Sequence, residues 1–173
     1  MTTFYMMVGL PGAGKSTWTD RFKRRNKMEL LDSFIFNDNL SVISTDTIIE
    51  RIAEEYRLTY NDVFDNITYS FSEKISHKMA EFAFARKDIV IWDQTNLTIK
   101  SRAKKLAMVP SDYKKICVLF GVPDDLSDRL NSRPGKIIPD NVMSNMIRSF
   151  QQPTITEGFD NIILPTDKID KYT

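Results

Sequence analysis

The residues with the clearest chemical potential are 9–17, which read Gly-Leu-Pro-Gly-Ala-Gly-Lys-Ser-Thr. They fit the phosphate-binding pattern G-x-x-x-x-G-K-[ST] and follow an apolar run, residues 4–8, as the strand–loop–helix context of that pattern requires. In such a loop the backbone N–H groups turn toward a nucleotide β-phosphate, and the following helix adds the positive end of its dipole. The simplest alternative is a glycine-rich turn that binds nothing.

Two side chains of this loop have specific expected roles. Lys15 is placed to reach the β- and γ-phosphates of a nucleotide, and the hydroxyl of Ser16 is placed to ligate Mg²⁺. The expected nucleotide contacts are therefore Gly9, Pro11, Gly12, Ala13, Gly14, Lys15, Ser16 and Thr17.

Two carboxylates follow predicted strands. Asp46 comes just after a short predicted strand at 41–44, where it could accept the proton of an attacking hydroxyl, as γ-phosphoryl transfer requires. Its plain alternative is a helix N-cap.

Asp93 directly follows the apolar run 89–92 and could hold Mg²⁺ directly or through water, or simply form a turn. Next to a phosphate-binding loop, both positions are candidates for catalysis.

A basic segment late in the chain suggests a closing lid. Residues 129–136 carry Arg129, Arg133 and Lys136 between two predicted helices, so we expect a small lid over about 129–139. An arginine in such a lid can neutralise charge on a phosphoryl group in transfer. An ordinary solvated basic turn is the alternative.

The overall charge excludes a global attraction for nucleic acid. The 24 basic and 23 acidic residues leave a net charge of +1, so any nucleic-acid contact must depend on a local patch. Lys100 and Arg102, with Lys104 and Lys105, open a predicted helix just past residues 89–92. They are the candidates to contact nucleic acid or phosphate near the expected cleft.

These residues need a scaffold, and the pattern predicts one with alternating strands and helices. Strands are expected at 3–8, 41–44, 89–92, 115–121 and 162–164, and helices at 14–26, 46–56, 65–86, 98–108, 123–130 and 139–150. Most strands are apolar throughout, which indicates a parallel sheet covered on both faces, with ligands at the carboxyl ends of the strands. The expected class is an α/β P-loop NTPase three-layer sandwich with about five parallel strands and a small helical lid.

Several details of this scaffold can be tested. In the helix predicted at 65–86, Phe71, Ile75, Met79 and Phe82 recur at intervals of three and four, the pattern of a helix lying on a sheet. A polar turn is expected near 59–62, and Asn96 or Thr98 is expected to cap the helix at 98–108.

Length and composition favour one domain over residues 1–173, since 42% of its residues are hydrophobic. No stretch approaches the ~20 apolar residues that span a bilayer, and no secretory signal is visible. The single cysteine, Cys117, lies in an apolar run and is expected to be a buried thiol. These features favour a reducing, cytoplasmic setting without a membrane partner, and leave an oligomer open.

The motifs together resemble the kinase domain of phage-type polynucleotide 5′-kinases, over nearly the whole chain. The similarity is carried by the loop at 9–17, by Asp46, by Asp93-Gln94-Thr95-Asn96-Leu97, and by the lid arginines followed by Ile-Ile-Pro139. The Asp-x-Thr-Asn-Leu segment and the lid followed by Ile-Pro are more specific than the loop alone.

The resemblance implies roles for these residues. Lys15 and Ser16 would bind the phosphates of ATP and Mg²⁺, and Asp46 would be the general base that activates a 5′-hydroxyl. Asp93, Thr95 and Asn96 would line the acceptor and phosphate site. Arg133, supported by Arg129, would act on the donor phosphates.

Two departures from the family stand out. The family places an arginine three residues after the general base to hold the acceptor phosphate, and this chain has Ile49 there. The phosphatase motif Asp-x-Asp-Gly-Thr of bifunctional members does not occur in this sequence. From the motifs and the resemblance taken together, we still expect an ATP-dependent kinase that acts on the 5′-hydroxyl ends of DNA or RNA. A small-molecule kinase and a non-catalytic nucleotide-binding switch are the alternatives.

Overall fold

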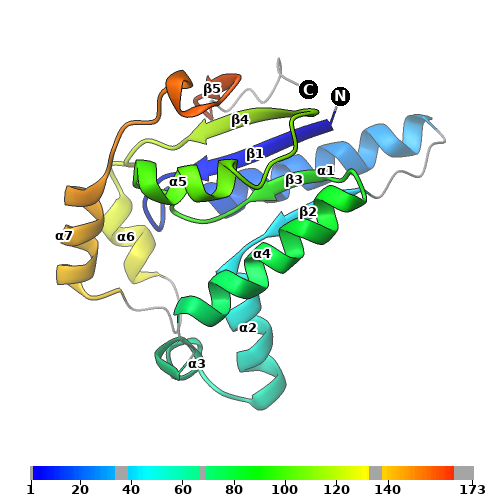
Figure 1. The fold of residues 1–173 in the computed structure, drawn as a ribbon. Helices are drawn as coiled ribbons and strands as arrows, with labels where there is room; N and C mark the ends of the chain where they lie inside the picture. The colour runs from blue at the N-terminus through cyan, green and yellow to red at the C-terminus, as the bar shows by residue number, and fades with distance from the viewer. Residues whose placement is uncertain (1, 34–38, 67–68, 133–137, 166–173) are drawn as a thin grey trace.

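A five-stranded parallel sheet forms the centre of the molecule (Figure 1). The computed structural model describes residues 2–33, 39–66, 69–132 and 138–165. The strand order is β2-β3-β1-β4-β5, and every neighbouring pair is parallel. The strands are β1 (Thr2–Val8), β2 (Leu40–Ile43), β3 (Ile89–Trp92), β4 (Tyr113–Leu119) and β5 (Asn161–Ile163). The predicted fold class is confirmed.

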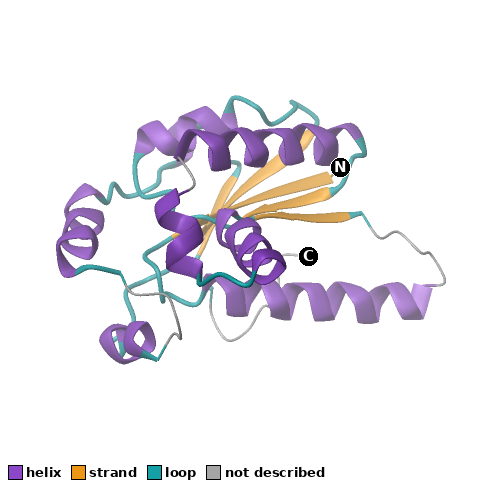
Figure 2. Ribbon diagram, turned by 90° about the horizontal axis from the view of Figure 1, so that it is seen from below, coloured by secondary structure: helices purple, strands orange, loops and turns teal. Residues whose placement is uncertain are grey.

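Alternate side chains of β1 enter two separate apolar cores. Phe4 and Met6 lie in a core with residues of α4 (Tyr69–Ala85) and α5 (Ile99–Leu106), whereas Tyr5 packs on the other face against α1 (Lys15–Ser33). Figure 2 shows the sheet between these two helical layers. Burial on both faces explains why the strands are apolar throughout. Cys117 is fully buried in β4, as predicted.

The segment between β2 and β3 differs from the prediction. The helix predicted at 65–86 corresponds to α4, which begins at Tyr69, and α2 (Thr45–Tyr56) agrees with its prediction. The helix α3 (Tyr60–Asn66) was not predicted. The polar turn expected near 59–62 is the start of α3: the Thr59 hydroxyl accepts from the Asp62 N–H, and the Asp62 carboxylate accepts from the Thr59 N–H. This reciprocal pairing is a capping box, a helix-start signal that the sequence does contain.

The apolar stripe predicted for α4 is wrong. Phe71, Met79 and Phe82 are exposed, Phe82 by 71%. The helix turns a face of small residues inward instead: Ser72, Ser76, Ala80 and Ala83 are buried. These small side chains let the helix lie close to the sheet, and Phe84 near its end packs on Phe4 of β1.

The remaining helices follow β4. They are α6 (Leu126–Asn131), α7 (Asp140–Ser149) and the short 3-10 helix η1 (Ile155–Glu157). Of the predicted lid, residues 133–137 lie outside the described part of the chain. The helix α1 runs seven residues past the predicted end at 26, to Ser33. Within the described ranges, no helix is long and apolar enough to cross a membrane.

Candidate active site

The loop between β1 and α1 has the backbone that phosphate binding needs. Gly12 and Gly14 have φ angles of 81° and 96°, which residues with a Cβ rarely adopt. At Gly9 a Cβ would come within 2.8 Å of the Phe120 Cβ. The glycines therefore let the chain turn tightly at the end of β1 and open α1 with its N–H groups at the loop.

The Lys15 side chain lies along this loop. It is buried, and its Nζ donates to the carbonyl oxygens of Gly9 at 3.0 Å and Leu10 at 2.8 Å. These carbonyls compensate the desolvated ammonium group. Ser16, the next residue, is exposed in the first turn of α1. The lysine and the serine are thus held at the entrance to α1, as the loop pattern predicts.

The carboxylate past β3, Asp93, lies within electrostatic range of both the loop lysine and Asp46, the carboxylate past β2. Burial raises the pKa of Asp93, the Lys15 ammonium acts against this rise, and the Asp46 carboxylate adds to it. The Asp93 N–H donates to the Ile43 carbonyl at 2.8 Å, which ties the end of β3 to the end of β2. Adjacent parallel strands therefore bring Asp46 and Asp93 to the same edge of the sheet.

Asp46 is not the N-cap of its helix. The cap is Ser44, whose side chain accepts from the Thr47 N–H, and Asp46 is exposed in the first turn of α2. One of its carboxylate oxygens, Oδ1, accepts a 2.7 Å hydrogen bond from the Tyr60 hydroxyl on α3. The capping alternative is therefore excluded, and a residue that the motifs did not indicate, Tyr60, joins the site.

The segment after β3 is fastened to the phosphate-binding loop. The Gly9 N–H donates to the Thr95 carbonyl at 3.0 Å, and Asn96 adopts a left-handed φ of 49°. The Asn96 Nδ2 donates to the Met7 carbonyl at 2.7 Å, and its Oδ1 accepts from Lys105. Asn96 is almost fully buried. Its expected substrate contact needs correction, because both ends of its amide are bonded inside the protein.

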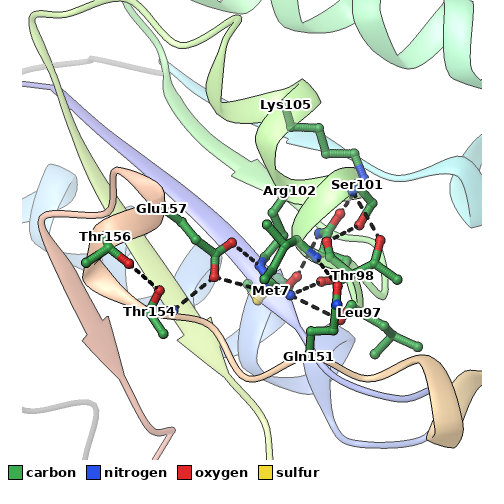
Figure 3. Close-up of polar contacts among 12 residues, drawn as sticks. Met7, Leu97, Thr98, Ser101, Arg102, Lys105, Gln151, Thr154, Thr156 and Glu157 are labelled. Carbon is green, nitrogen blue, oxygen red and sulfur yellow. Dashed lines mark hydrogen bonds and ion pairs between the residues drawn. The ribbon is translucent and has the colours of Figure 1, made fainter.

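Arg102 also departs from expectation. Its guanidinium is fully buried and forms a two-bond ion pair with Glu157 of η1, at 2.7 and 2.8 Å (Figure 3). Its Nη1 donates to the carbonyls of Asn96 and Leu97. The expected contact of Arg102 with substrate phosphate is therefore wrong, since the side chain turns inward to brace the segment after β3. The sequence gives no sign of this because Glu157 lies far along the chain.

Lys105 follows Arg102 into the interior. It is buried over the Trp92 ring, with its Nζ 5.5 Å from the ring centroid. Burial lowers the pKa of Lys105 to about 8, and the nearby Glu73 carboxylate partly offsets this. Of the two acceptor-site cations expected on α5, Lys100 remains exposed. Thr98 caps this helix by accepting from the Ser101 N–H, which confirms one of the two predicted caps.

Arg129 lies on α6, beside the phosphate-binding loop. Its Nη1 is 3.9 Å from the position that a Cβ on Gly14 would take, and its Nε donates to Asp125 at 2.7 Å. The ion pair with Asp125 orients the Arg129 guanidinium, although the Arg129 side chain is exposed. Arg133, the other expected lid arginine, lies outside the described residues, so its role stays a prediction.

The chemistry of these residues fits a nucleotide with Mg²⁺. No group of three or more His, Cys, Asp or Glu side chains in the described part of the chain could hold a metal ion by itself. A magnesium ion at a phosphate-binding loop needs no such group, because it is held by one or two protein oxygens, substrate phosphates and water. Ser16 and Asp93 are the residues that would supply these protein oxygens.

The loop, the sheet order and the carboxylates at two strand ends define a P-loop nucleotide-binding domain with a kinase-type fold. Residues 4–153 match the AAA domain family model AAA_33, and the chain therefore belongs to that family.

Three solved structures share the fold. A gluconokinase from Sinorhizobium meliloti 1021 aligns with a TM-score of 0.55 at 15% identity, over 94% of this chain and 81% of that chain. A shikimate kinase from Bacteroides thetaiotaomicron gives 0.52 at 17%, over 94% and 86%. The Pnkp1/Rnl/Hen1 complex gives 0.52 at 19%, over 80% of this chain and 42% of that chain. At these identities the likeness concerns the fold.

Two curated relatives are similar along most of this chain. The L-seryl-tRNA(Sec) kinase of Methanococcus maripaludis is 24% identical over 168 residues, which is 96% of this chain and 59% of that protein. The human heterogeneous nuclear ribonucleoprotein U-like protein 2 is 24% identical over 164 residues, 91% of this chain and 20% of that protein. The chain thus spans only part of the length of the curated relatives it matches.

Proposed function

We propose that this chain is an ATP-dependent kinase, a single domain over residues 1–173, that transfers the γ-phosphoryl group of ATP to a hydroxyl acceptor. The leading acceptor is the 5′-hydroxyl of DNA or RNA. One observation carries the proposal: Asp46, exposed and held by Tyr60, shares an edge of the sheet with Asp93 and Lys15. A nucleotide-binding switch has no need of a carboxylate that faces an acceptor.

In this mechanism the protein groups orient the reactants and move one proton. Lys15 donates to the donor phosphates, and Asp46 accepts the proton of the attacking hydroxyl as the new P–O bond forms. The bond to the leaving ADP oxygen breaks in the same transfer. Ser16 and Asp93 would hold Mg²⁺, which would neutralise negative charge on the phosphates when bound. Arg129 and Arg133 of the lid bring positive charge to the phosphoryl group.

The activities named for several similar proteins support a kinase. L-seryl-tRNA(Sec) kinase, gluconokinase and shikimate kinase all name a kinase activity. These names cover acceptors of different kinds, from a charged tRNA to small molecules. They therefore favour phosphoryl transfer over a switch without choosing the acceptor.

A small-molecule kinase is the second candidate, and the burial of Ile49 favours it. Ile49 is 4% exposed and packs against α3, so no cation stands where the polynucleotide kinases place an arginine. Arg102 and Lys105 also turn inward. Fewer cations near the acceptor suit a substrate with few phosphates.

The test is transfer of label from γ-labelled ATP to a panel of acceptors. The panel contains 5′-hydroxyl DNA and RNA, the same strands with a 5′-phosphate, nucleosides, gluconate and shikimate. Labelling of the 5′-hydroxyl strands, and of no 5′-phosphorylated strand, is the expected result. Labelling of gluconate or shikimate alone would establish the small-molecule kinase, and an unlabelled panel would favour the switch.

A further inference from the structure

A stacked pair of aromatic rings, the half-buried Tyr60 and the exposed Phe64, lies beside the proposed base. Tyr60 and Phe64 stand one turn apart on α3, with ring centroids 5.9 Å apart and planes inclined by 17°. Phe64 is 56% exposed. The Tyr60 hydroxyl donates to Asp46 Oδ1 at 2.7 Å, so Tyr60 links the ring pair directly to the carboxylate.

The pair is held in place by a small apolar core between α2 and α3. Ile49 and Ala53 of α2 are buried against Val63 of α3, and Tyr60 packs on this cluster. The capping box of Thr59 and Asp62 fixes the start of α3. The rings are thus presented by a docked helix with a defined beginning, and Tyr60 spans from this core to the carboxylate.

The same core determines what the site can recognise. The helix position three residues after Asp46 is occupied by buried Ile49, so this face of α2 fastens α3 instead of holding a phosphate. The stacked rings of Tyr60 and Phe64 on α3 form a flat aromatic surface at this place. Such surfaces bind nucleobases by stacking, with little dependence on base identity.

We infer that Tyr60 and Phe64 form the acceptor's base-binding surface: the terminal nucleobase stacks on the pair while its 5′-hydroxyl meets Asp46. The inference depends on the proposed function and deepens it. It assigns the acceptor to the nucleoside-bearing class, in which one sugar ring separates the base from the reactive hydroxyl. Sugar acids present no aromatic face to this surface.

The two residues have separable tasks in this arrangement. Phe64 contributes ring surface to acceptor binding. Tyr60 contributes ring surface and, through its hydroxyl, orients the Asp46 carboxylate, so it is a positioning residue for the base. Removal of the Tyr60 hydroxyl alone should lower kcat and leave acceptor KM nearly unchanged.

The test compares Phe64→Ala, Phe64→Trp and Tyr60→Phe with wild type on a 5′-hydroxyl oligonucleotide. Phe64→Ala should raise acceptor KM ~10- to 100-fold, the scale of one lost base stack, with ATP KM and kcat nearly unchanged. Phe64→Trp should restore the wild-type acceptor KM. Phe82→Ala is the matched control, since Phe82 is 71% exposed on α4 and should change neither constant.

A second acceptor separates stacking from general damage. The same oligonucleotide with an abasic 5′-terminal residue should bind wild type and Phe64→Ala alike, because the base that stacks is missing. An equal loss on both oligonucleotides, or an unchanged KM for Phe64→Ala on the normal strand, would overturn the inference while leaving the kinase intact. Absence of transfer by wild type to any hydroxyl acceptor would instead overturn the proposed function.

Discussion

At the scale of single residues, the site depends on where its charges are held. The Lys15 ammonium is anchored on two backbone carbonyls of its own loop, and the Asp46 carboxylate is anchored on the Tyr60 hydroxyl. The contact with Tyr60 thereby orients the Asp46 carboxylate before a substrate arrives. Preoriented groups need little rearrangement during the reaction, which is the usual source of electrostatic catalysis.

Replacement of Lys15 tests the donor site. Lys15→Ala removes the cation that would contact the β- and γ-phosphates, so ATP affinity should weaken and transfer should be lost. Calorimetric titration with ATP measures the first effect and label transfer the second. Lys78→Ala is the control, because Lys78 forms an exposed pair with Glu81 on α4. Near-normal turnover of Lys15→Ala would rule out the loop as the donor site.

At the scale of elements, the segment after β3 is the best-supported part of the site. It is bonded to the phosphate-binding loop through Gly9 and Thr95, to β1 through Asn96, and to η1 through Arg102 and Glu157. Burial would raise the pKa of Glu157, but hydrogen bonds from Arg102 and the Thr154 backbone hold that pKa below its usual value. We interpret Arg102 and Glu157 as the support that fixes Asp93 and Thr95.

Loss of this support should be costly. Arg102→Met leaves the buried Glu157 carboxylate without its partner, so the free energy of unfolding should fall by ~3–5 kcal/mol. Chemical denaturation measures it. Lys87→Met breaks a pair with Asp112 that is equally short but exposed, and it should have a much smaller effect. Similar losses for the two variants would contradict a special role for the buried pair.

Lys105 predicts a specific pH dependence of stability. Its pKa falls from 10.5 to about 8 in the folded protein. Between these values the unfolded chain binds the proton and the folded chain does not, so stability rises with pH. Relative to Lys105→Met, the wild-type free energy of unfolding should increase by up to ~1.4 kcal/mol per pH unit across this window. A flat or falling difference would contradict the lowered pKa.

The sequence predicted some elements and missed others for identifiable reasons. The loop at 9–17 and the apolar strands were predictable because backbone geometry and two-sided burial restrict their composition. The helix α3 was missed because the capping box at Thr59 looked like a turn. The inward face of α4 was missed because small serines and alanines make up most of it, joined near the end of the helix by Phe84, which packs on Phe4.

The basic start of α5 shows a further limit. Lys100, Arg102 and Lys105 look like one solvated patch in sequence, yet only Lys100 is exposed among them. The partners that bury the other two, Glu157 and Asn96, become neighbours only in the folded chain. The Tyr60 contact with Asp46 was hidden for the same reason.

At the scale of the whole molecule, the sheet order explains how the site is assembled. Placing β3 between β1 and β2 puts the carboxyl ends of three strands side by side, so the phosphate-binding loop, Asp93 and Asp46 meet at one edge. The helices α3 and α6 come from distant parts of the chain and supply Tyr60 and Arg129. We therefore interpret the edge of the sheet as the catalytic centre and the flanking helices as the source of specificity.

The proposed mechanism requires that Asp46 accepts the proton of a hydroxyl during phosphoryl transfer from ATP. The most direct measurement is the rate of label transfer from γ-labelled ATP to a 5′-hydroxyl oligonucleotide by wild type and Asp46→Asn, with ATP affinity measured in parallel. Asp65→Asn, a change of an exposed carboxylate on α3, is the control. We expect transfer by wild type, a rate ~10²–10⁴ lower for Asp46→Asn, and equal ATP affinity. Undiminished transfer by Asp46→Asn, or a matching loss of ATP affinity, would contradict this mechanism.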